Sequence, residues 1–278
     1  MCRKATGPPP GGWPRTRRSR ALRSAFSVAG DGPALVLIHG IGARRATFDG
    51  MVAGLKDRFT CITYDLRGHG LSPLPDGRFG LDDLVDDLEE LRARLGVERA
   101  HFAGHSLGGM IGPRYALRYP ERVLSLGLWS TAAFRTEDDS AKVRAVVAAM
   151  RERGIGPVLD TLTARWFTDE FCAARPEVID WRKTQVTETD AEVFLNVFDI
   201  YATTEMAPWL HEVKAPAQII TGELDGGCNP RLNRAIHAAL PGSELVILDG
   251  LKHAILIEAT DRVLPDVRRF LLAQAAGG

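Results

Sequence analysis

Short apolar runs alternate with longer amphipathic stretches along the chain from residue 34 onward. The run 34–39, Ala-Leu-Val-Leu-Ile-His, is almost continuously apolar and lies between Gly32-Pro33 and Gly40, which is typical of a strand covered on both faces of a sheet. Similar runs predict further strands at 59–65, 99–104, 122–129, 217–221 and 243–249. Because helical stretches separate these strands, the pattern predicts an α/β fold with a doubly wound, mostly parallel sheet.

The helices that connect these strands follow from the spacing of apolar residues. Leucines and a valine recur at helical spacing over 81–95, and the pattern stops at Gly96, a residue that commonly ends helices. A second helix is expected from Leu107 to about Tyr119, because Pro120 cannot continue it. A closing helix is expected over 261–275.

The strand pattern is interrupted between residues 131 and 210, where only helical candidates occur. One candidate opens with a capping box over 189–192, Thr-Asp-Ala-Glu. We therefore expect an α/β core made of residues 23–130 and 211–278, with 131–210 inserted as a helical lid.

The predicted lid is rich in aromatic residues. It holds nine of the twenty in the chain: Phe134, Trp166, Phe167, Phe171, Trp181, Phe194, Phe198, Tyr201 and Trp209. Phe134, Trp166 and Phe198 are candidates for lining a substrate pocket. The alternative is that these side chains form the hydrophobic core of the lid itself.

Charge and cysteine content narrow the classes of function. Lys plus Arg and Asp plus Glu both number 35, so no overall field attracts nucleic acid or an anionic membrane. A small-molecule substrate fits a formal net charge of zero better than nucleic acid or an anionic membrane does. The four cysteines are scattered without metal-ligand spacing, so we expect reduced thiols, no metal, no cofactor and a cytoplasmic protein. No apolar run approaches the roughly 20 residues that a membrane-spanning helix needs.

Residues 1–22 differ from the rest of the chain. They are rich in Arg, Pro and Gly and contain no acidic residue. Such a segment cannot form a packed core, so we expect a disordered basic extension. It also lacks the apolar region of a secretory signal. The open alternatives are a translation start assigned too far upstream, an organelle transit peptide and a basic binding arm.

Ser106 stands at the centre of the run 104–108, Gly-His-Ser-Leu-Gly, between a predicted strand and a predicted helix. A serine hydroxyl is a poor nucleophile at neutral pH, so it needs a neighbouring base and a geometry that presents its oxygen. Glycines two residues before and after the serine permit a sharp turn that projects it over the sheet edge. The pattern therefore predicts a covalent nucleophile, and an ordinary strand-to-helix turn is the alternative.

At this residue the chain resembles the α/β-hydrolase fold family, and the resemblance extends over about 34–272 apart from the lid. The run 39–42, His-Gly-Ile-Gly, follows the strand after which this family carries its oxyanion-hole turn. The resemblance therefore implies that the N–H groups of Ile41 and Leu107 bind the oxyanion. A dinucleotide-binding loop fits less well, because Arg45 stands where the third glycine of that motif belongs.

The same resemblance implies catalytic residues in the order Ser, Asp, His. Asp225 ends the run 221–225, Thr-Gly-Glu-Leu-Asp, where the acid of the family belongs, and His253 follows the last predicted strand. His253 would accept the proton of Ser106, and Asp225 would fix the tautomer of the imidazole and stabilise its charged form. Glu223 is the fallback acid.

The other histidines are expected to have smaller roles. His69 lies in the run 65–72, Asp-Leu-Arg-Gly-His-Gly-Leu-Ser, which resembles a structural turn of the family, so we expect it to hold a loop. His105 and Gly40 are expected in the wall of the substrate pocket. Three histidines have no partner motif and are expected on the surface: His101, His211 and His237.

The identity of the predicted nucleophile limits which reactions of this fold family fit the sequence. A serine at position 106 argues against the branches of this fold that form their ester on a carboxylate. The motifs most resemble the serine branch of 3-oxoadipate enol-lactonases and small-molecule esterases, which implies hydrolysis of a small carboxylic ester or lactone through an acyl-enzyme. Two alternatives stay open: a C–C bond hydrolase of meta-cleavage products from aromatic degradation, and a non-catalytic ligand-binding member of the fold.

Overall fold

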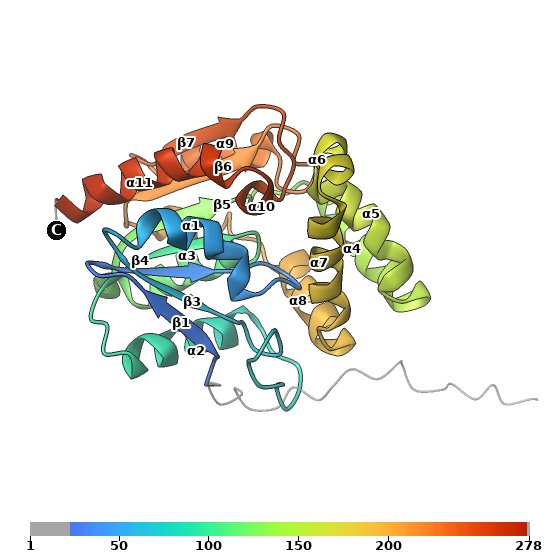
Figure 1. Cartoon of the computed structure of the whole chain (residues 1–278), viewed down its shortest axis with the longest axis horizontal. Helices are drawn as coiled ribbons and strands as arrows, with labels where there is room; N and C mark the ends of the chain where they lie inside the picture. Colours follow the sequence, from blue (N-terminus) through green and yellow to red (C-terminus); the bar gives the residue numbers. More distant parts are fainter. Residues whose placement is uncertain (1–22, 277–278) are drawn as a thin grey trace, which may run out of the picture.

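The computed structural model describes residues 23–276, which form a seven-stranded sheet in the order β1-β3-β2-β4-β5-β6-β7 (Figure 1). The strands are β1 (Phe26–Ala29), β2 (Ala34–Ile38), β3 (Thr60–Tyr64), β4 (Ala100–His105), β5 (Val123–Trp129), β6 (Ala217–Gly222) and β7 (Glu244–Leu248). Pairing is parallel from β3 through β7, and β1 pairs with β3 antiparallel. The predicted mostly parallel sheet is confirmed. β1 escaped prediction because its four residues are largely exposed and carry no two-sided apolar run.

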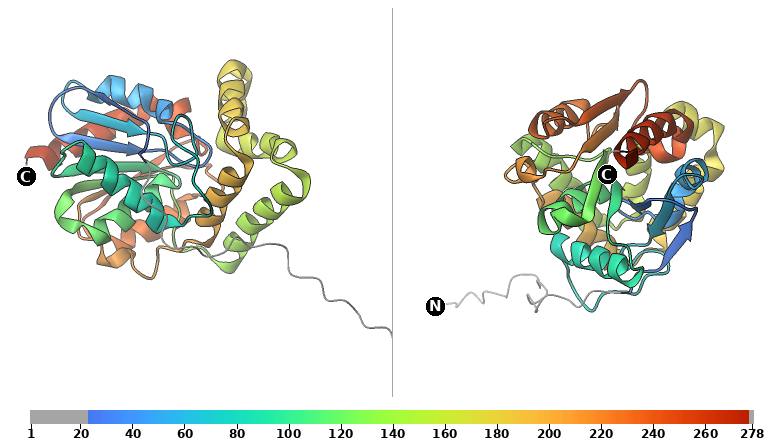
Figure 2. Two further views of the ribbon diagram at one scale, coloured as in Figure 1. Left: turned by 90° about the horizontal axis from the view of Figure 1, so that it is seen from below. Right: turned by 90° about the vertical axis from the view of Figure 1, so that its left-hand side faces the viewer.

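Helices cover both faces of the sheet, as the right-hand view of Figure 2 shows. The helices are α1 (Asp49–Leu55), α2 (Leu81–Arg94), α3 (Gly108–Arg118), α9 (Pro230–Ala239), α10 (Ile255–Glu258) and α11 (Thr260–Ala276), with short 3-10 turns at Arg45–Phe48, Pro120–Arg122 and Leu210–Glu212. Alternate residues of β2 explain the two layers. Leu35 and Leu37 pack in the cluster that contains α1 and α11, whereas Val36 and Ile38 pack in the cluster that contains α2, α3 and α9. Both faces of the strand are buried, so its sequence is continuously apolar.

Five helices lie between β5 and β6. They are α4 (Glu137–Arg153), α5 (Gly156–Trp166), α6 (Asp169–Ala174), α7 (Pro176–Thr187) and α8 (Ala191–Thr203). Figure 1 shows α4 to α8 gathered to the right of the sheet. The predicted insertion 131–210 contains these helices and, within the described chain, no strand. Its assignment as a lid over a core of 23–130 and 211–278 stays a prediction.

The start of α8 corrects one detail of the sequence interpretation. The helix is capped by Asp190, whose carboxylate accepts the N–H groups of Glu192 and Val193. Thr189, the predicted cap, instead donates its hydroxyl to the carbonyl of Gln185 at 2.8 Å, so it belongs to the preceding turn. The cap therefore lies one residue later than predicted.

His101 is another correction, because it is fully buried in β4 rather than exposed. Its ring lies edge-on to Phe59 and its Nδ1 is 2.8 Å from the Ser125 hydroxyl on β5. Burial, followed by the charge of Arg99, lowers the pKa of His101 to about 4, so the ring is neutral at pH 7.

Two further expectations concern the N-terminal extension and membrane-spanning helices. The predicted disordered extension, residues 1–22, lies outside the described residues. None of the helices over 23–276 is long and apolar enough to cross a membrane.

Candidate active site

The carboxyl ends of four parallel strands meet at one cavity of about 240 Å³. The loop 40–42 follows β2, Ser106 follows β4, Asp225 follows β6 and His253 follows β7. All four contribute to the cavity wall. This is the edge at which open α/β sheets bind their ligands. The helices between β5 and β6 complete the wall, with side chains that include Trp166 and Phe198.

Ser106 occupies a sharp turn between β4 and α3, where its φ is +57°, a left-handed value that non-glycine residues rarely adopt. The flanking glycines are required by close packing. A Cβ on Gly104 would lie 2.1 Å from the backbone of Gly108, and one on Gly108 would lie 2.1 Å from the carbonyl oxygen of Ile38. A Cβ on Gly40 would lie 2.9 Å from Cβ of Ser106, which places the loop after β2 directly beside the serine. The glycine spacing is therefore a steric condition for this turn.

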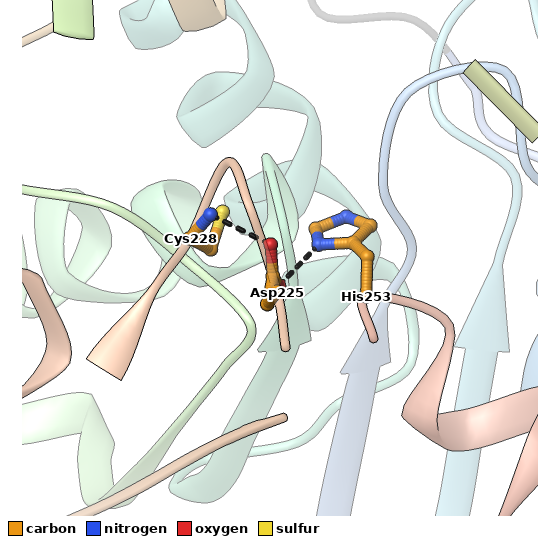
Figure 3. A group of neighbouring side chains, drawn as sticks. All are labelled: Asp225, Cys228 and His253. Carbon is orange, nitrogen blue, oxygen red and sulfur yellow. Dashed lines mark hydrogen bonds and ion pairs between the residues drawn. The ribbon is translucent and has the colours of Figure 1, made fainter. Parts of the chain in front are cut away.

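Asp225 and His253 form a hydrogen-bonded pair, drawn in Figure 3, with 2.7 Å between Oδ2 of the carboxylate and Nδ1 of the ring. Since an ionised carboxylate only accepts hydrogen bonds, Nδ1 carries a proton, and in the neutral ring Nε2 is the free basic nitrogen. The other oxygen, Oδ1, accepts the backbone N–H groups of Gly227 and Cys228 at 2.9 and 2.8 Å. These three donors fix the orientation of the buried carboxylate.

The two groups shift each other's titration. Burial opposes ionisation of Asp225, but the His253 ring and the two backbone N–H groups outweigh it and lower the pKa of Asp225. Burial likewise opposes protonation of His253, but the charge and hydrogen bond of Asp225, with Cys228 beside them, raise the pKa of His253 above its usual value. The pair thus stabilises a positive charge on the ring.

The loop 40–42, called the oxyanion loop below after its expected role, and the turn at Ser106 both carry a backbone N–H group without an acceptor among the described residues. The N–H of Gly42 donates to Nε2 of His69 at 3.2 Å, and the N–H of Ala43 donates to the carbonyl of Gly40 at 3.3 Å. Among the described residues the N–H of Ile41 has no acceptor, and the same holds for the N–H of Leu107 beside the serine. These are the two donors that the sequence analysis assigned to an oxyanion.

Two buried histidines, His39 and His69, form hydrogen bonds with this loop. Nε2 of His39 accepts the N–H of Leu66 at 2.9 Å, while its Nδ1 lies 2.8 Å from the carbonyl oxygen of Gly40. His69 contacts the carbonyl of Arg67 through Nδ1 and the loop through Nε2. Burial lowers the pKa of His69 to about 4 and that of His39 well below its usual value, so both rings are neutral. His69 therefore holds a loop, as its motif predicted.

His105 also has a structural contact, although it lines the cavity. Its Nε2 lies 2.9 Å from the carbonyl oxygen of His253, so the ring donates this hydrogen bond. Burial, followed by the charge of His253, lowers the pKa of His105 to about 3. The neutral ring fixes the loop that carries His253, and the N–H of Ala254 donates to the carbonyl of Trp166 on the other side at 2.8 Å.

Asp225, Cys228 and His253 also offer one metal-ligand atom each, and these atoms lie within 4.8 Å of one another (Figure 3). The spacing of the acid and the base argues against a shared ion. Two ligands bound to one zinc at about 2.0 to 2.1 Å in tetrahedral geometry lie roughly 3.3 Å apart, whereas these two atoms are 2.7 Å apart and share a proton. The arrangement found is that of an acid-base pair.

Of the other residues predicted to form the substrate pocket, four line the cavity and one does not. Gly40, His105, Trp166 and Phe198 line the cavity, but Phe134 does not. Phe134 packs against the hydrophobic core, and its N–H donates to the carboxylate of Glu205. Glu223, the fallback acid, is exposed and accepts the N–H of Gly250, and in the described part of the chain the carboxylate on His253 is that of Asp225.

The cavity wall also contains polar residues that the sequence analysis did not assign to it, among them Arg182, Tyr201 and Cys228. The Tyr201 hydroxyl lies 3.2 Å from Sγ of Cys228, which is buried next to the Asp225 carboxylate. Arg182 reaches from α7 to the oxyanion loop. The contacts of Tyr201 with Cys228 and of Arg182 with the loop join segments distant in sequence, and no local motif marks these residues.

Comparison with known proteins gives one family and consistent relatives. A model of the alpha/beta hydrolase fold matches residues 33–260. The 3-oxoadipate enol-lactonase 2 of Acinetobacter baylyi is 30% identical over 210 residues, which are 76% of this chain and 78% of that protein. The crystal structure of an enol-lactonase from Burkholderia xenovorans has a TM-score of 0.84 at 26% identity, covering 92% of this chain and 99% of the other. A thermophilic esterase from Thermogutta terrifontis has a TM-score of 0.81 at 25% identity, covering 91% and 94%.

Proposed function

The chain belongs to the α/β-hydrolase fold family, and from that premise we propose that it is a serine hydrolase that cleaves a small carboxylic ester or lactone. Its relatives named above are enol-lactonases and an esterase. The observation that carries the proposal is the convergence on one cavity of a serine with a left-handed backbone, a buried Asp-His pair and two unengaged N–H groups. A nucleophile, a general base with its orienting acid, and an oxyanion hole are the parts that acyl transfer needs.

In the proposed reaction the hydroxyl oxygen of Ser106 attacks the substrate carbonyl carbon while Nε2 of His253 takes the hydroxyl proton. The carbonyl oxygen becomes an oxyanion on the N–H groups of Ile41 and Leu107. When the ester C–O bond breaks, His253 returns the proton to the leaving oxygen, and Ser106 carries the acyl group. For a lactone the leaving hydroxyl stays attached to that group.

Water completes the cycle by the same steps. His253 takes a proton from water, the resulting hydroxide attacks the acyl carbon, and the bond to Ser106 breaks with return of the proton to its oxygen. Asp225 keeps the proton of His253 on Nδ1 throughout and stabilises the charged ring. Gly40 and His105 form the wall beside the serine. Trp166 and Phe198 present apolar surface for the remainder of the substrate.

A substrate panel tests the proposal. Wild type and His253→Ala are assayed with p-nitrophenyl esters, simple lactones and meta-cleavage products, with folding checked by circular dichroism. We expect turnover of esters or lactones by wild type and a loss of at least about 10³-fold in kcat for the variant. Turnover of a C–C substrate alone would replace the proposed reaction with the C–C hydrolase alternative. Failure of every substrate with folded wild type would favour a ligand-binding function.

A further inference from the structure

Arg182 is a buried cation in the wall of the Ser106 cavity. It projects from α7, is 7% exposed, and donates through Nη1 to the carbonyl of Gly42 at 2.6 Å and through Nη2 to the carbonyl of Ile41 at 2.9 Å. Its guanidinium carbon lies 4.6 Å from the ring centre of Trp166. Over residues 23–276 no carboxylate forms an ion pair with it. This charge is therefore solvated by carbonyl dipoles and an aromatic face rather than by an anion.

An isolated buried charge is unfavourable unless it is paired or hydrogen-bonded. A guanidinium has five N–H bonds, and the hydrogen bonds of Arg182 to the oxyanion loop use two of them. Burial lowers the pKa of Arg182 to about 9, and no acidic group offsets this effect. The side chain is still cationic at pH 7, and its three other N–H bonds have no acceptor within the described part of the chain.

A second guanidinium lines the same cavity. Arg135 stacks on Tyr201, with 4.3 Å from its guanidinium carbon to the ring centre, and its Nη1 donates to the carbonyl of Thr204. Its Nε and Nη2 are buried without an acceptor in the described residues. Two arginines thus line one cavity.

The acidic residues of the cavity wall do not balance these charges. The wall contains four cationic side chains: Arg135, Lys142, Arg165 and Arg182. Its two acids are already paired, Asp139 with Arg231 and Asp225 with His253. The cavity therefore has an excess of positive charge, although the formal net charge of the whole chain is zero.

We propose that the substrate carries a free carboxylate in addition to the ester or lactone group that is cleaved, and that Arg182 binds this carboxylate while it holds the oxyanion loop. A planar guanidinium with N–H bonds left over matches the two oxygens of a carboxylate. The excess positive charge of the cavity wall also favours an anionic substrate over a neutral one. This inference rests on the proposed hydrolase function and specifies its substrate class.

Two esters that differ only at the far end of the acyl chain test the inference. Mono-p-nitrophenyl glutarate ends in a carboxylate where p-nitrophenyl pentanoate ends in a methyl group. We expect wild type to prefer the glutarate by at least about 10-fold in kcat/KM, and Arg182→Gln to reduce this preference at least about 10-fold. Both substrates lose the support of the oxyanion loop in the variant, so the ratio isolates carboxylate binding. Arg175→Gln, an exposed arginine at the start of the same helix, is the control and should keep the wild-type ratio.

Binding of free glutarate tests the carboxylate site separately from hydrolysis at Ser106. Glutarate should inhibit pentanoate hydrolysis competitively and raise the melting temperature of wild type, with both effects lost in Arg182→Gln and retained in Arg175→Gln. Inorganic phosphate at equal concentration should give the weaker effect.

Four outcomes decide the matter. Hydrolysis of both esters with no wild-type preference, or with the same ratio in Arg182→Gln, overturns the inference and leaves the hydrolase function intact. A stronger effect of phosphate than of glutarate also overturns it. Hydrolysis of neither ester, with stabilisation by glutarate that needs Arg182, supports the carboxylate site and counts against the hydrolase. If Arg182→Gln does not fold, the wild-type preference and glutarate inhibition still decide, because their absence overturns the inference.

Discussion

Replacement of Asp225 by Asn changes the tautomer of His253 with little change in shape. Oδ1 of the carboxylate is held by the N–H groups of Gly227 and Cys228, so the amide oxygen of Asn takes this position. The NH₂ group then replaces Oδ2, at 2.7 Å from Nδ1 of His253. Because the NH₂ group only donates, Nδ1 must accept and the ring proton moves to Nε2. A ring protonated at Nε2 cannot take the proton of Ser106.

The cost of restoring the working tautomer sets the magnitude. Turning the Asn amide over would leave two buried donors without an acceptor, the N–H of Cys228 and the NH₂ group of Asn itself, at about 1 to 3 kcal/mol each. The total of about 2 to 6 kcal/mol corresponds to a loss in kcat between about 30-fold and about 10⁴-fold. The same exchange in the triad of a serine protease costs about 10⁴-fold, so we expect the upper part of this range.

Initial rates of p-nitrophenyl ester hydrolysis between pH 5 and pH 10 measure the effect. Asp225 raises the pKa of His253 in the wild type, and the neutral ring is the base, so kcat/KM falls as pH drops through that pKa. In Asp225→Asn the raising effect is lost and burial remains, so the fall moves to lower pH. Glu223→Gln, an exposed carboxylate exchanged for an amide two residues away, should behave as wild type. A rate loss below about 3-fold for Asp225→Asn, or an equal loss for Glu223→Gln, would refute the tautomer argument.

Three further changes test the supporting structure. Gly104→Ala places a Cβ 2.1 Å from the backbone at the start of α3 and should lower the melting temperature by several degrees or prevent folding, whereas Gly112→Ala in the same helix meets only a 3.5 Å contact and should be neutral or stabilising in a thermal melt. Arg67→Met removes a fully buried partner of Asp87 and should cost about 3 to 5 kcal/mol in urea unfolding; a loss below about 1 kcal/mol would contradict this. Cys228→Ala should keep kcat within about 10-fold, because the backbone N–H rather than the thiol holds the acid; a 10³-fold loss would assign a role to Sγ.

The parts of the site set by local sequence were predictable. Glycines at 104 and 108 are required by contacts within the turn itself and with β2, so the spacing around Ser106 carries the geometry. The strands could be located because burial on both faces makes them continuously apolar. Asp225 and His253 were placed by family resemblance together with their position after strands, not by periodicity.

The parts set by contacts between distant segments were not predictable. Arg182 acquires its role from carbonyls about 140 residues earlier in the chain, and nothing in the sequence of α7 shows which of its side chains faces the cavity. His101 lacks a motif, and the Ser125 hydroxyl that its buried ring contacts lies on the neighbouring strand β5. Phe134 was assigned to the pocket as an aromatic residue, but its backbone contact with Glu205 directs it elsewhere.

Covalent labelling of Ser106 is the most direct test of the account. Wild type, Ser106→Ala and His253→Ala are incubated with a fluorophosphonate, and adducts are located by intact-protein and peptide mass spectrometry. The account predicts one adduct per wild-type chain on the peptide that contains Ser106, none in Ser106→Ala, and labelling slowed at least about 10²-fold in His253→Ala. Folded wild-type protein that stays unlabelled, or an adduct on a different residue, would contradict the assignment of Ser106 as the nucleophile.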